Sequence, residues 1–176
     1  MVDFPLTELV VIRQAEKADL PALEWEGEYS HFRRLFAEAY QRAERGEAVM
    51  WVAELPERGI IGQLFVQMNG KEPEMRSLLT REDNGRAYIY GFRVRPDYRR
   101  SGIGSRLLQV AEADLARRGF RKVALNVARD NLDARRLYER SGYRVIAAEP
   151  GTWSYLDPDG HRQHVCEPAW RMEKLL

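Results

Sequence analysis

The segment Val94 to Ser105 (VRPDYRRSGIGS) constrains the fold of this chain more than any other part of the sequence. An apolar, β-prone run ends at a proline, a short basic loop follows, and Gly102 and Gly104 then open a helix predicted over 102–118. The first amides of a helix have no partner within it, and the helix dipole adds positive potential at that end. Glycine also lets a ligand approach the backbone, and the loop supplies arginines, so we expect an anion such as pyrophosphate to bind here.

Two common phosphate-binding motifs are excluded by the residues around these glycines. The segment has no Gly-Lys-Ser/Thr, so it is not the P-loop of nucleotide triphosphatases. The dinucleotide-binding motif needs a third glycine, and Leu107 stands at that position. It also needs an acidic residue after the second strand of the unit, whereas that strand ends in Asn126-Val127-Ala128. From the residues alone, a glycine-rich turn that only starts a helix stays an open alternative.

Two motifs of the chain resemble signature segments of the GCN5-related N-acetyltransferase superfamily. Arg99 to Gly104 (RRSGIG), preceded by Val94-Arg95-Pro96, is similar to the acetyl-CoA signature Arg/Gln-x-x-Gly-x-Gly/Ala. Asn131 to Tyr143 is similar to the later segment Asn-x-x-Ala-x-x-Leu-Tyr-x-x-x-Gly-Phe/Tyr. The two motifs occur in the family's order, with a helix and a strand between them. The resemblance is sharp over 87–145 and only architectural over the rest of the chain.

The resemblance implies an N-acetyltransferase that uses acetyl-CoA as acyl donor and transfers the acetyl group directly to a primary amine in a ternary complex. It implies that Tyr138 lies near the sulfur and protonates the departing thiolate, and that Asn131 bonds the pantetheine. The implied cofactor-binding set comprises Phe92, Arg93, Val94, Arg99, Arg100, Ser101, Gly102, Ile103, Gly104, Ser105 and Asn131. A non-catalytic acyl-CoA-binding module of the same fold is the alternative function.

Residue type alone leaves other roles open for two of these residues. Tyr138 follows a core leucine and is compatible with a plain core aromatic, and Asn131 stands where it can cap the helix predicted over 131–140. A strand amide, that of Phe92 or Val94, is expected to stabilise the negative charge that develops on the acyl oxygen.

The proton acceptor is not evident from the sequence. A free alkylamine has a pKa near 10.4, so only about one molecule in 10³ is unprotonated at pH 7 and its proton must be removed. Some relatives that acetylate protein N-termini carry a glutamate five residues before the asparagine of the later motif. That position is Asn126 here, which cannot act as a base. Water, Glu26 and Glu28 remain as candidate acceptors.

The segment Leu23 to Tyr29 (LEWEGEY) interleaves three carboxylates with two aromatic rings in the half of the chain expected to bind the acceptor. Such a surface attracts cations through charge and cation–π contacts, so we expect a small cationic amine as acceptor. An exposed acidic turn with Trp25 in the core is the alternative. Tyr90, expected to face the same way as Phe92 and Val94, and Trp51 are further candidates to line this pocket or the core.

The net charge of +1 conceals a basic segment over 86–145 between acidic flanks. A basic segment can bind nucleic acid, but acidic flanks repel a polyanion, so no nucleic-acid partner is expected.

The chain has no run of 18 apolar residues and no basic, apolar leader, so neither a membrane span nor secretion is expected. Cys166 is the sole cysteine, which excludes an internal disulfide and suits the reducing cytoplasm. His161 and His164 have no obvious acidic third ligand, so no metal is assigned.

The length and the hydrophobic pattern predict one domain over 1–176, of mixed α/β class, and the resemblance implies that it is an N-acetyltransferase domain. We expect a mixed, mostly antiparallel sheet with helices on both faces; splayed central strands are implied by the resemblance. Asp19 and Ser30 are predicted helix caps, 70–86 is predicted as a loop, and 153–156 is predicted to pair with 165–172 around a turn. Exposed terminal strands favour pairing with a second subunit, so a homodimer is one expectation.

Overall fold

A computed structural model of the protein describes residues 5–68 and 85–176. Its main sheet has seven strands in the order β1-β2-β3-β4-β5-β9-β6, and β7 and β8 form a separate two-stranded ribbon. The strands are β1 (Val11–Gln14), β2 (Ala48–Leu55), β3 (Gly59–Gln67), β4 (Arg86–Val94), β5 (Lys122–Ala128), β6 (Arg144–Glu149), β7 (Thr152–Leu156), β8 (Arg162–Cys166) and β9 (Ala169–Leu175). Within the described residues β4 and β5 run parallel and the other paired strands are antiparallel, as expected.

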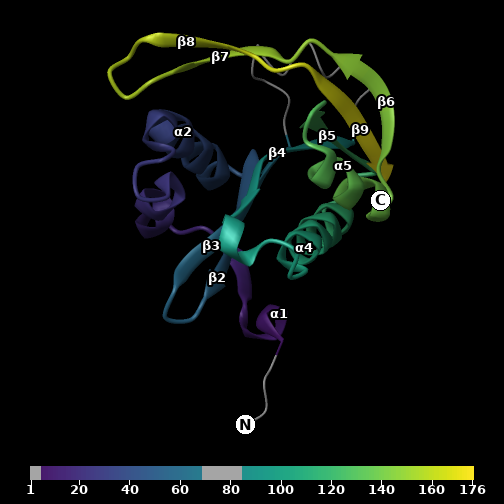
Figure 1. Ribbon diagram of the computed structural model, residues 1–176, viewed down its shortest axis with the longest axis horizontal. Helices are drawn as coiled ribbons and strands as arrows, with labels where there is room; N and C mark the ends of the chain where they lie inside the picture. Colours follow the sequence, from purple (N-terminus) through teal and green to yellow (C-terminus); the bar gives the residue numbers. More distant parts are fainter. Residues whose placement is uncertain (1–4, 69–84) are drawn as a thin grey trace.

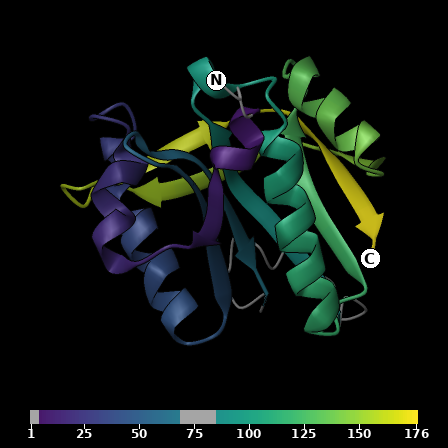
Figure 2. The same ribbon diagram turned by 90° about the horizontal axis from the view of Figure 1, so that it is seen from below.

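Helices cover both faces of the sheet (Figures 1 and 2), which confirms the expected architecture. The α2 face carries η1 (Lys17–Glu24), η2 (Ser30–Phe32) and α2 (Arg33–Glu44), whereas the α4 face carries α1 (Leu6–Leu9), α4 (Ile103–Arg117) and α5 (Leu132–Arg140). A short helix, η3 (Pro96–Tyr98), lies in the loop before α4. Each face has its own buried apolar cluster. No described helix is long and apolar enough to pass through a bilayer.

Helix α4 is anchored to the sheet by the apolar stripe that the sequence predicts. Ile103, Leu107, Ala111 and Leu115 are buried, and Leu108 joins them. Burial of each of the larger side chains contributes about 1.5–3 kcal/mol to folding, so this stripe fixes the start of α4 firmly against the sheet.

The two central strands separate along their length. Pairing between β4 and β5 runs from Arg86–Lys122 to Ile89–Leu125 and then stops, although β4 continues to Val94. The expected splay is therefore present, and it lies next to the start of α4.

A bulge in β4 decides which way its side chains face. Gly91 has φ +59°, and a Cβ there would lie 2.7 Å from Cδ2 of Phe65, so only glycine fits. The register with β3 shifts at this point. Tyr90 therefore belongs to the α2 face and Phe92 to the α4 face, and the expectation that both face the same way is wrong.

The predicted pairing of 153–156 with 165–172 is confirmed in part, because Trp153 lies opposite Val165. Residues 165–172 do not form one strand: β8 pairs with β7, and β9 enters the main sheet between β5 and β6. Together β6–β9 and β7–β8 form one long hairpin, bent where Gly151 accepts a hydrogen bond from the amide of Glu167 (2.9 Å). A Cβ on Gly151 would lie 1.7 Å from the carbonyl oxygen of Glu167, so the bend requires glycine. The outer half arches over α2 (Figure 1).

This pairing also changes the argument for a dimer. The C-terminal strand β9 is internal and β6 is the edge strand, so the chain end is not the exposed strand that the sequence suggested.

Three local predictions need correction or fall outside the structure. Asp19 is not the cap of η1 but the third residue of a capping box closed by Glu16, and Ser30 begins η2 without a side-chain cap bond. The predicted loop over 70–86 lies mostly outside the described residues, and Arg86 already belongs to β4.

Candidate functional site

The start of α4 is an exposed helix end held in place by the N-terminal segment. Gly102 caps it with φ +86°. A Cβ on Gly102 would meet Cγ2 of Thr7 at 3.2 Å. Arg106 donates hydrogen bonds to the carbonyls of Thr7 and Val10, the latter at 2.6 Å. Ile103 is buried, so its backbone amide rather than its side chain can contact a ligand.

The basic loop before α4 is fixed by its own backbone and by α5. Arg99 donates from Nε to the carbonyl of Val94 (2.8 Å), and the hydroxyl of Ser101 donates to the carbonyl of Tyr98. Arg100 adopts φ +58°, which is unusual for a non-glycine residue, and its guanidinium lies 3.5 Å from Asp133. Both arginine side chains are exposed beside the helix end, so the positive potential expected there is present.

Three elements meet beside this helix end. A Cβ on Gly104 would lie 3.2 Å from Cδ2 of Leu137 and 3.5 Å from Cζ of Phe92, so glycine allows α4, α5 and β4 to approach closely. The ring of Phe92 lies 6.0 Å from that of Tyr138, centroid to centroid. The structure thus brings the later motif against the splayed part of β4, as the resemblance implies.

Tyr138 is buried, with 7% of its surface exposed. Burial, and secondarily the nearby phenol of Tyr88, raises the pKa of its hydroxyl above the ordinary value near 10. The hydroxyl therefore stays protonated across the physiological range and can donate a hydrogen bond, whereas full release of its proton is harder than for an exposed phenol.

The remaining predicted residues on this side occupy supporting positions. Asn131 is exposed and caps α5, where its Oδ1 accepts a hydrogen bond from the amide of Ala134 (3.2 Å). The capping role is thus confirmed. Val94 packs against the α4-face cluster, and Ser105 is half-buried in the first turn of α4.

Arg93 does not join the other predicted side chains. Its guanidinium lies on the α2 face, 3.5 Å from the ring centroid of Tyr29 and 5.5 Å from that of Trp25. Burial lowers the pKa of this guanidinium. Consecutive residues of a strand face opposite sides, and the bulge at Gly91 decides that Arg93, rather than Phe92, lies on the α2 face.

The acidic segment is largely paired within the chain. Both carboxylate oxygens of Glu26 accept from Arg95, at 2.7 and 2.9 Å, and this ion pair lowers the pKa of Glu26. A carboxylate with a lowered pKa is a poor proton acceptor, so the geometry disfavours Glu26 as the base. Trp25 is buried, as in the alternative reading of this segment, and Glu28 is exposed.

The α2 face holds an aromatic cluster that extends to the ribbon. Tyr88 and Tyr90 stack with their centroids 6.4 Å apart, and Tyr90 meets Phe65 edge-on at 5.7 Å. Farther along, Phe32 lies 5.0 Å from Tyr155 and 6.0 Å from Trp153. Trp51, also proposed for the pocket, is instead buried in the cluster on the α4 face.

Tyr88 is a site residue that the sequence reading missed. It stands on β4 opposite Ala124, at the end of the paired stretch, and burial raises the pKa of its hydroxyl to about 12. Asn126 follows on β5, and its Oδ1 is buried without a hydrogen-bond partner among the described residues. A tyrosine inside a β-prone run gives no local signal of such a position.

The ribbon turn gathers more acidic groups around His161 than the sequence reading recognised. Ligand atoms of Asp157, Asp159 and His161 lie within 4.8 Å of one another. Asp157 already accepts hydrogen bonds from the amides of Asp159 and His161 and from Gln163, which accounts for the cluster as a stabilised turn.

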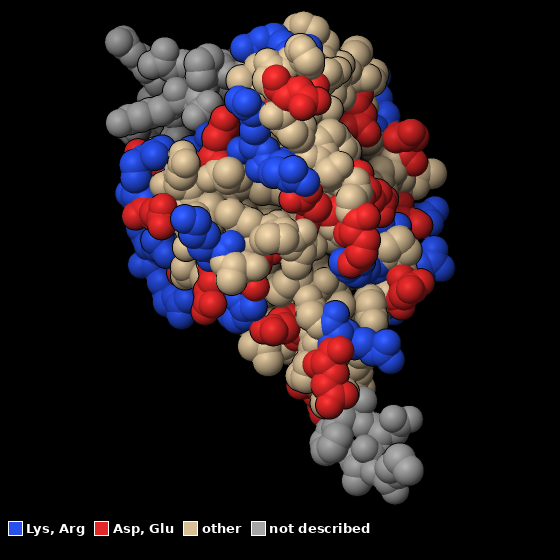
Figure 3. All heavy atoms as spheres, turned by 90° about the vertical axis from the view of Figure 1, so that its left-hand side faces the viewer, with Lys and Arg blue, Asp and Glu red and all other residues tan. Residues whose placement is uncertain are grey.

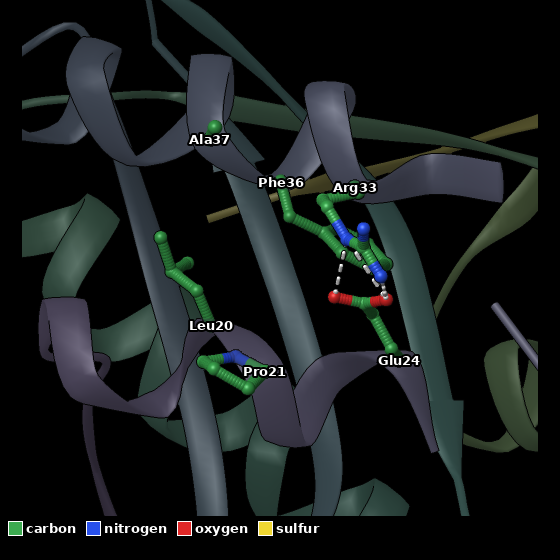
Figure 4. A pocket seen from close by; sticks show the side chains of 6 residues that line it. All are labelled: Leu20, Pro21, Glu24, Arg33, Phe36 and Ala37. Atoms are coloured by element: carbon green, nitrogen blue, oxygen red, sulfur yellow. Dashed lines mark hydrogen bonds and ion pairs between the residues drawn. The ribbon is translucent and has the colours of Figure 1, made fainter. Parts of the chain in front are cut away.

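A surface hollow between η1 and α2 lies apart from the splay (Figure 4). Its lining residues are Leu20, Pro21, Glu24, Arg33, Phe36 and Ala37. The ion pair between Arg33 and Glu24 (2.8 Å) spans one end, and the remaining lining is apolar. Figure 3, which views the side of α2 and the ribbon, shows acidic and basic side chains interspersed.

Solved structures share this fold. The ribosomal-protein-S18-alanine N-acetyltransferase from Escherichia coli superposes with a TM-score of 0.67 and 22% identity, covering 94% of this chain and 93% of that one. Arabidopsis thaliana NAA60 in complex with acetyl-CoA superposes with a TM-score of 0.66 and 24% identity, covering 95% and 98%. At these identities the likeness establishes the fold alone.

Sequence relatives are similar over part of their length. The uncharacterized N-acetyltransferase YycN of Bacillus subtilis is 28% identical over 95 residues, which is 54% of this chain and 54% of that protein. The matched part therefore spans about half the length of this relative. The model of the Acetyltransferase (GNAT) family matches residues 12–143, which include both motifs and the splayed strands. The chain therefore belongs to the GNAT acetyltransferase family.

Proposed function

We propose that the protein is an acetyl-CoA-dependent N-acetyltransferase whose acceptor is a small cationic amine. One observation carries the proposal: the exposed start of α4, the splay between β4 and β5, and the buried hydroxyl of Tyr138 all meet around Phe92. An anion-binding helix end beside a gap between strands, with a protonated acid at that gap, suits a diphosphate-bearing thioester.

The residues present fit coenzyme A. Gly102 adds no side chain of its own at the helix end, and the exposed Arg99 and Arg100 flank it. The amides of residues 102–105 would hold the diphosphate. The part of β4 that β5 leaves unpaired, from Tyr90 to Val94, would hold the pantetheine through its backbone. When bound, acetyl-CoA supplies an acyl carbon activated as a thioester.

The reaction forms a bond between the amine nitrogen and the acyl carbon and breaks the bond between that carbon and sulfur. A cationic amine loses two protons from its nitrogen: one is released to solvent, and the other restores the phenol of Tyr138 after Tyr138 has protonated the sulfur. The first proton passes to water or to the exposed Glu28, because Glu26 is held by Arg95 and Asn126 is not basic. Tyr138 donates to the sulfur as it departs. Because burial raises the pKa of this phenol, Tyr138 acts on the sulfur first as a hydrogen-bond donor and releases its proton only when the carbon–sulfur bond is nearly broken.

The α2 face supports a small acceptor. Trp153 and Tyr155 of the ribbon lie against Phe32, so side chains already cover the way from α2 toward the splay. Since Tyr29 and Glu26 are engaged by the chain's own arginines, attraction for a cation comes from Glu28 and from the rings of Tyr88 and Tyr90.

The test combines binding and turnover. Acetyl-CoA is titrated calorimetrically, and thiol release is then measured with a small diamine, a neutral amino acid and a peptide with a free N-terminus. We expect micromolar binding and fastest turnover of the diamine. Faster turnover of the peptide contradicts the acceptor, and binding without turnover of any amine indicates an acyl-CoA-binding module instead.

A matched pair of variants tests the helix end. Gly102→Glu places a negative charge at the diphosphate position and should abolish binding of acetyl-CoA. Gly102→Ala imposes the same positive-φ strain and the same contact with Thr7 without the charge, and should bind measurably. Equal affinities of the two variants for acetyl-CoA would contradict the proposal that the diphosphate binds at this helix end.

A further inference from the structure

Gln63 is a fully buried polar residue in the apolar strand β3. Its side-chain Nε2 donates a hydrogen bond to the carbonyl oxygen of Gly91, 3.1 Å away, within the bulge of β4. Its Oε1 is buried with no hydrogen-bond partner among the described residues. An unsatisfied buried oxygen costs stability, so the packing of the core alone does not account for a glutamine here.

The bond to Gly91 also fixes a second group. A peptide unit is planar and trans, so the carbonyl of Gly91 and the amide N–H of Phe92 point in opposite directions. Because Gln63 holds that carbonyl on the side of β3, the N–H of Phe92 is directed away from β3. β5 lies beyond β4 on that other side, and it no longer pairs with β4 after Ile89.

We propose that Gln63 is a positioning residue that aims the amide of Phe92 at the acyl oxygen of the bound thioester. The inference rests on the proposed N-acetyltransferase function and selects Phe92 over Val94 as the donor. A donor fixed before the reaction stabilises the charge that develops on this oxygen without reorganising. The bulge fixes the orientation of the peptide unit between Gly91 and Phe92. The hydrogen bond from Gln63 takes the place of the backbone hydrogen bond between β3 and β4 that the bulge removes.

The test reads the acyl carbonyl directly and needs no acceptor. Acetyl-CoA labelled with ¹³C at the acyl carbonyl is bound to the protein, and the carbonyl stretch is recorded by infrared difference spectroscopy. A hydrogen bond from the amide lowers this frequency relative to free acetyl-CoA. In Gln63→Met we expect most of the lowering to be lost while the dissociation constant of acetyl-CoA changes less than about threefold, since the diphosphate contacts remain.

The matched control is Gln67→Met. Gln67 is also buried on β3, opposite Tyr88, and its replacement removes an amide of the same size outside the bulge. It should keep the wild-type frequency. If Gln63→Met does not fold, Gln63→Leu also removes the donor to the carbonyl of Gly91 and keeps an apolar side chain of similar volume.

The outcomes separate the inference from the proposed function. An unchanged frequency in Gln63→Met, or equal losses in both glutamine variants, overturns the role of Gln63 and leaves acetyl-CoA binding standing. Absence of acetyl-CoA binding to the wild type overturns the proposed function and the inference with it. With an amine that turns over, kcat of Gln63→Met should fall about tenfold at nearly constant KM, less than the 10²–10³ lost with a whole oxyanion donor.

Discussion

Single side chains at the splay combine burial with hydrogen-bonding capacity. Tyr138, Tyr88 and Gln63 are each largely shielded from water, yet each carries a polar group. In such surroundings a hydrogen bond is stronger than in water, and an ionised group is costlier. The phenols are therefore kept neutral by their environment, which suits donation of a hydrogen bond to a departing sulfur.

Replacing Tyr138 by phenylalanine should lower kcat while leaving cofactor binding intact. The ring stays in contact with Phe92 and Tyr143, so only the donor is lost. We expect kcat to fall by about 10²-fold, as for loss of a general acid, and the dissociation constant of acetyl-CoA to stay within about twofold. Thiol release and calorimetry measure the two quantities. Tyr40→Phe on α2 is the control, and a wild-type rate in Tyr138→Phe removes this hydroxyl from the chemistry.

The buried phenols also predict how stability changes at alkaline pH. In the folded protein burial raises the pKa of Tyr88 to about 12 and raises that of Tyr138 as well, whereas in the unfolded chain each titrates near 10. The contribution of these two phenols to the free energy of unfolding is complete below pH 10. It is lost as the pH rises above 10, because the unfolded chain then releases its phenol protons before the folded protein does.

Urea unfolding between pH 9 and pH 11.5 measures this effect. Each phenol should lower the free energy of unfolding by up to about 1.4 kcal/mol per pH unit above pH 10. Tyr138→Phe removes one such group, so its stability should decline less steeply than that of the wild type. Parallel curves for the two proteins would show that Tyr138 titrates normally in the fold.

At the scale of elements, the bulge in β4 is the feature that organises the site. It places Phe92 toward α4 and α5 and places Arg93 among the aromatic rings of the α2 face, and in the proposed function it orients the peptide unit that would bind the acyl oxygen. The close approach of Gly91 to Phe65 ties this geometry to β3.

Gly91→Ala should therefore damage the fold and the chemistry together. A left-handed backbone costs a non-glycine residue roughly 1–2 kcal/mol, and the new Cβ would also collide with Phe65. Gly119→Ala is the control, because Gly119 has φ +88° but nothing within 4 Å of an added Cβ. In urea unfolding we expect Gly91→Ala to lower the free energy of unfolding by at least about 1 kcal/mol more than Gly119→Ala does. Equal losses would mean that the bulge relaxes freely.

At the scale of the whole molecule, one bent hairpin joins the two faces. Its inner half extends the sheet through β9 and β6, and its outer half lies over α2, where Trp153 and Tyr155 contact Phe32. The α2 face, where the proposed acceptor would bind, is thereby covered in part by residues that are far away from α2 in the chain. The range of acceptors should depend on this contact.

Replacing Trp153 and Tyr155 together by alanine should release the ribbon from α2. Aromatic pairs contribute about 0.5–1.5 kcal/mol each beyond buried area, so the amides of β7 and β8 should exchange with solvent about tenfold faster. Hydrogen exchange followed by mass spectrometry measures this change. Val165→Ala, opposite Trp153 on β8, tests for general loosening of the ribbon. Unchanged exchange in the double variant would show that the ring contacts do not hold the ribbon.

The sequence by itself determined most of the elements and the glycine-opened start of α4. The local signals are the helical spacing of apolar residues in α4, the proline that begins η3 and the two glycines at the start of α4. Each acts through its immediate neighbours in the chain. Asn131 as a cap and the expectation of splayed strands came from the same short segments.

Only the tertiary structure decided which side chains meet. A one-residue bulge reverses the facing of every later position in a strand, which sent Arg93 to the α2 face. Arg95, directly after β4, forms an ion pair with Glu26, far away in the sequence, and β9 enters between β5 and β6. Such pairings depend on the packing of distant segments, and no local pattern of residues encodes them.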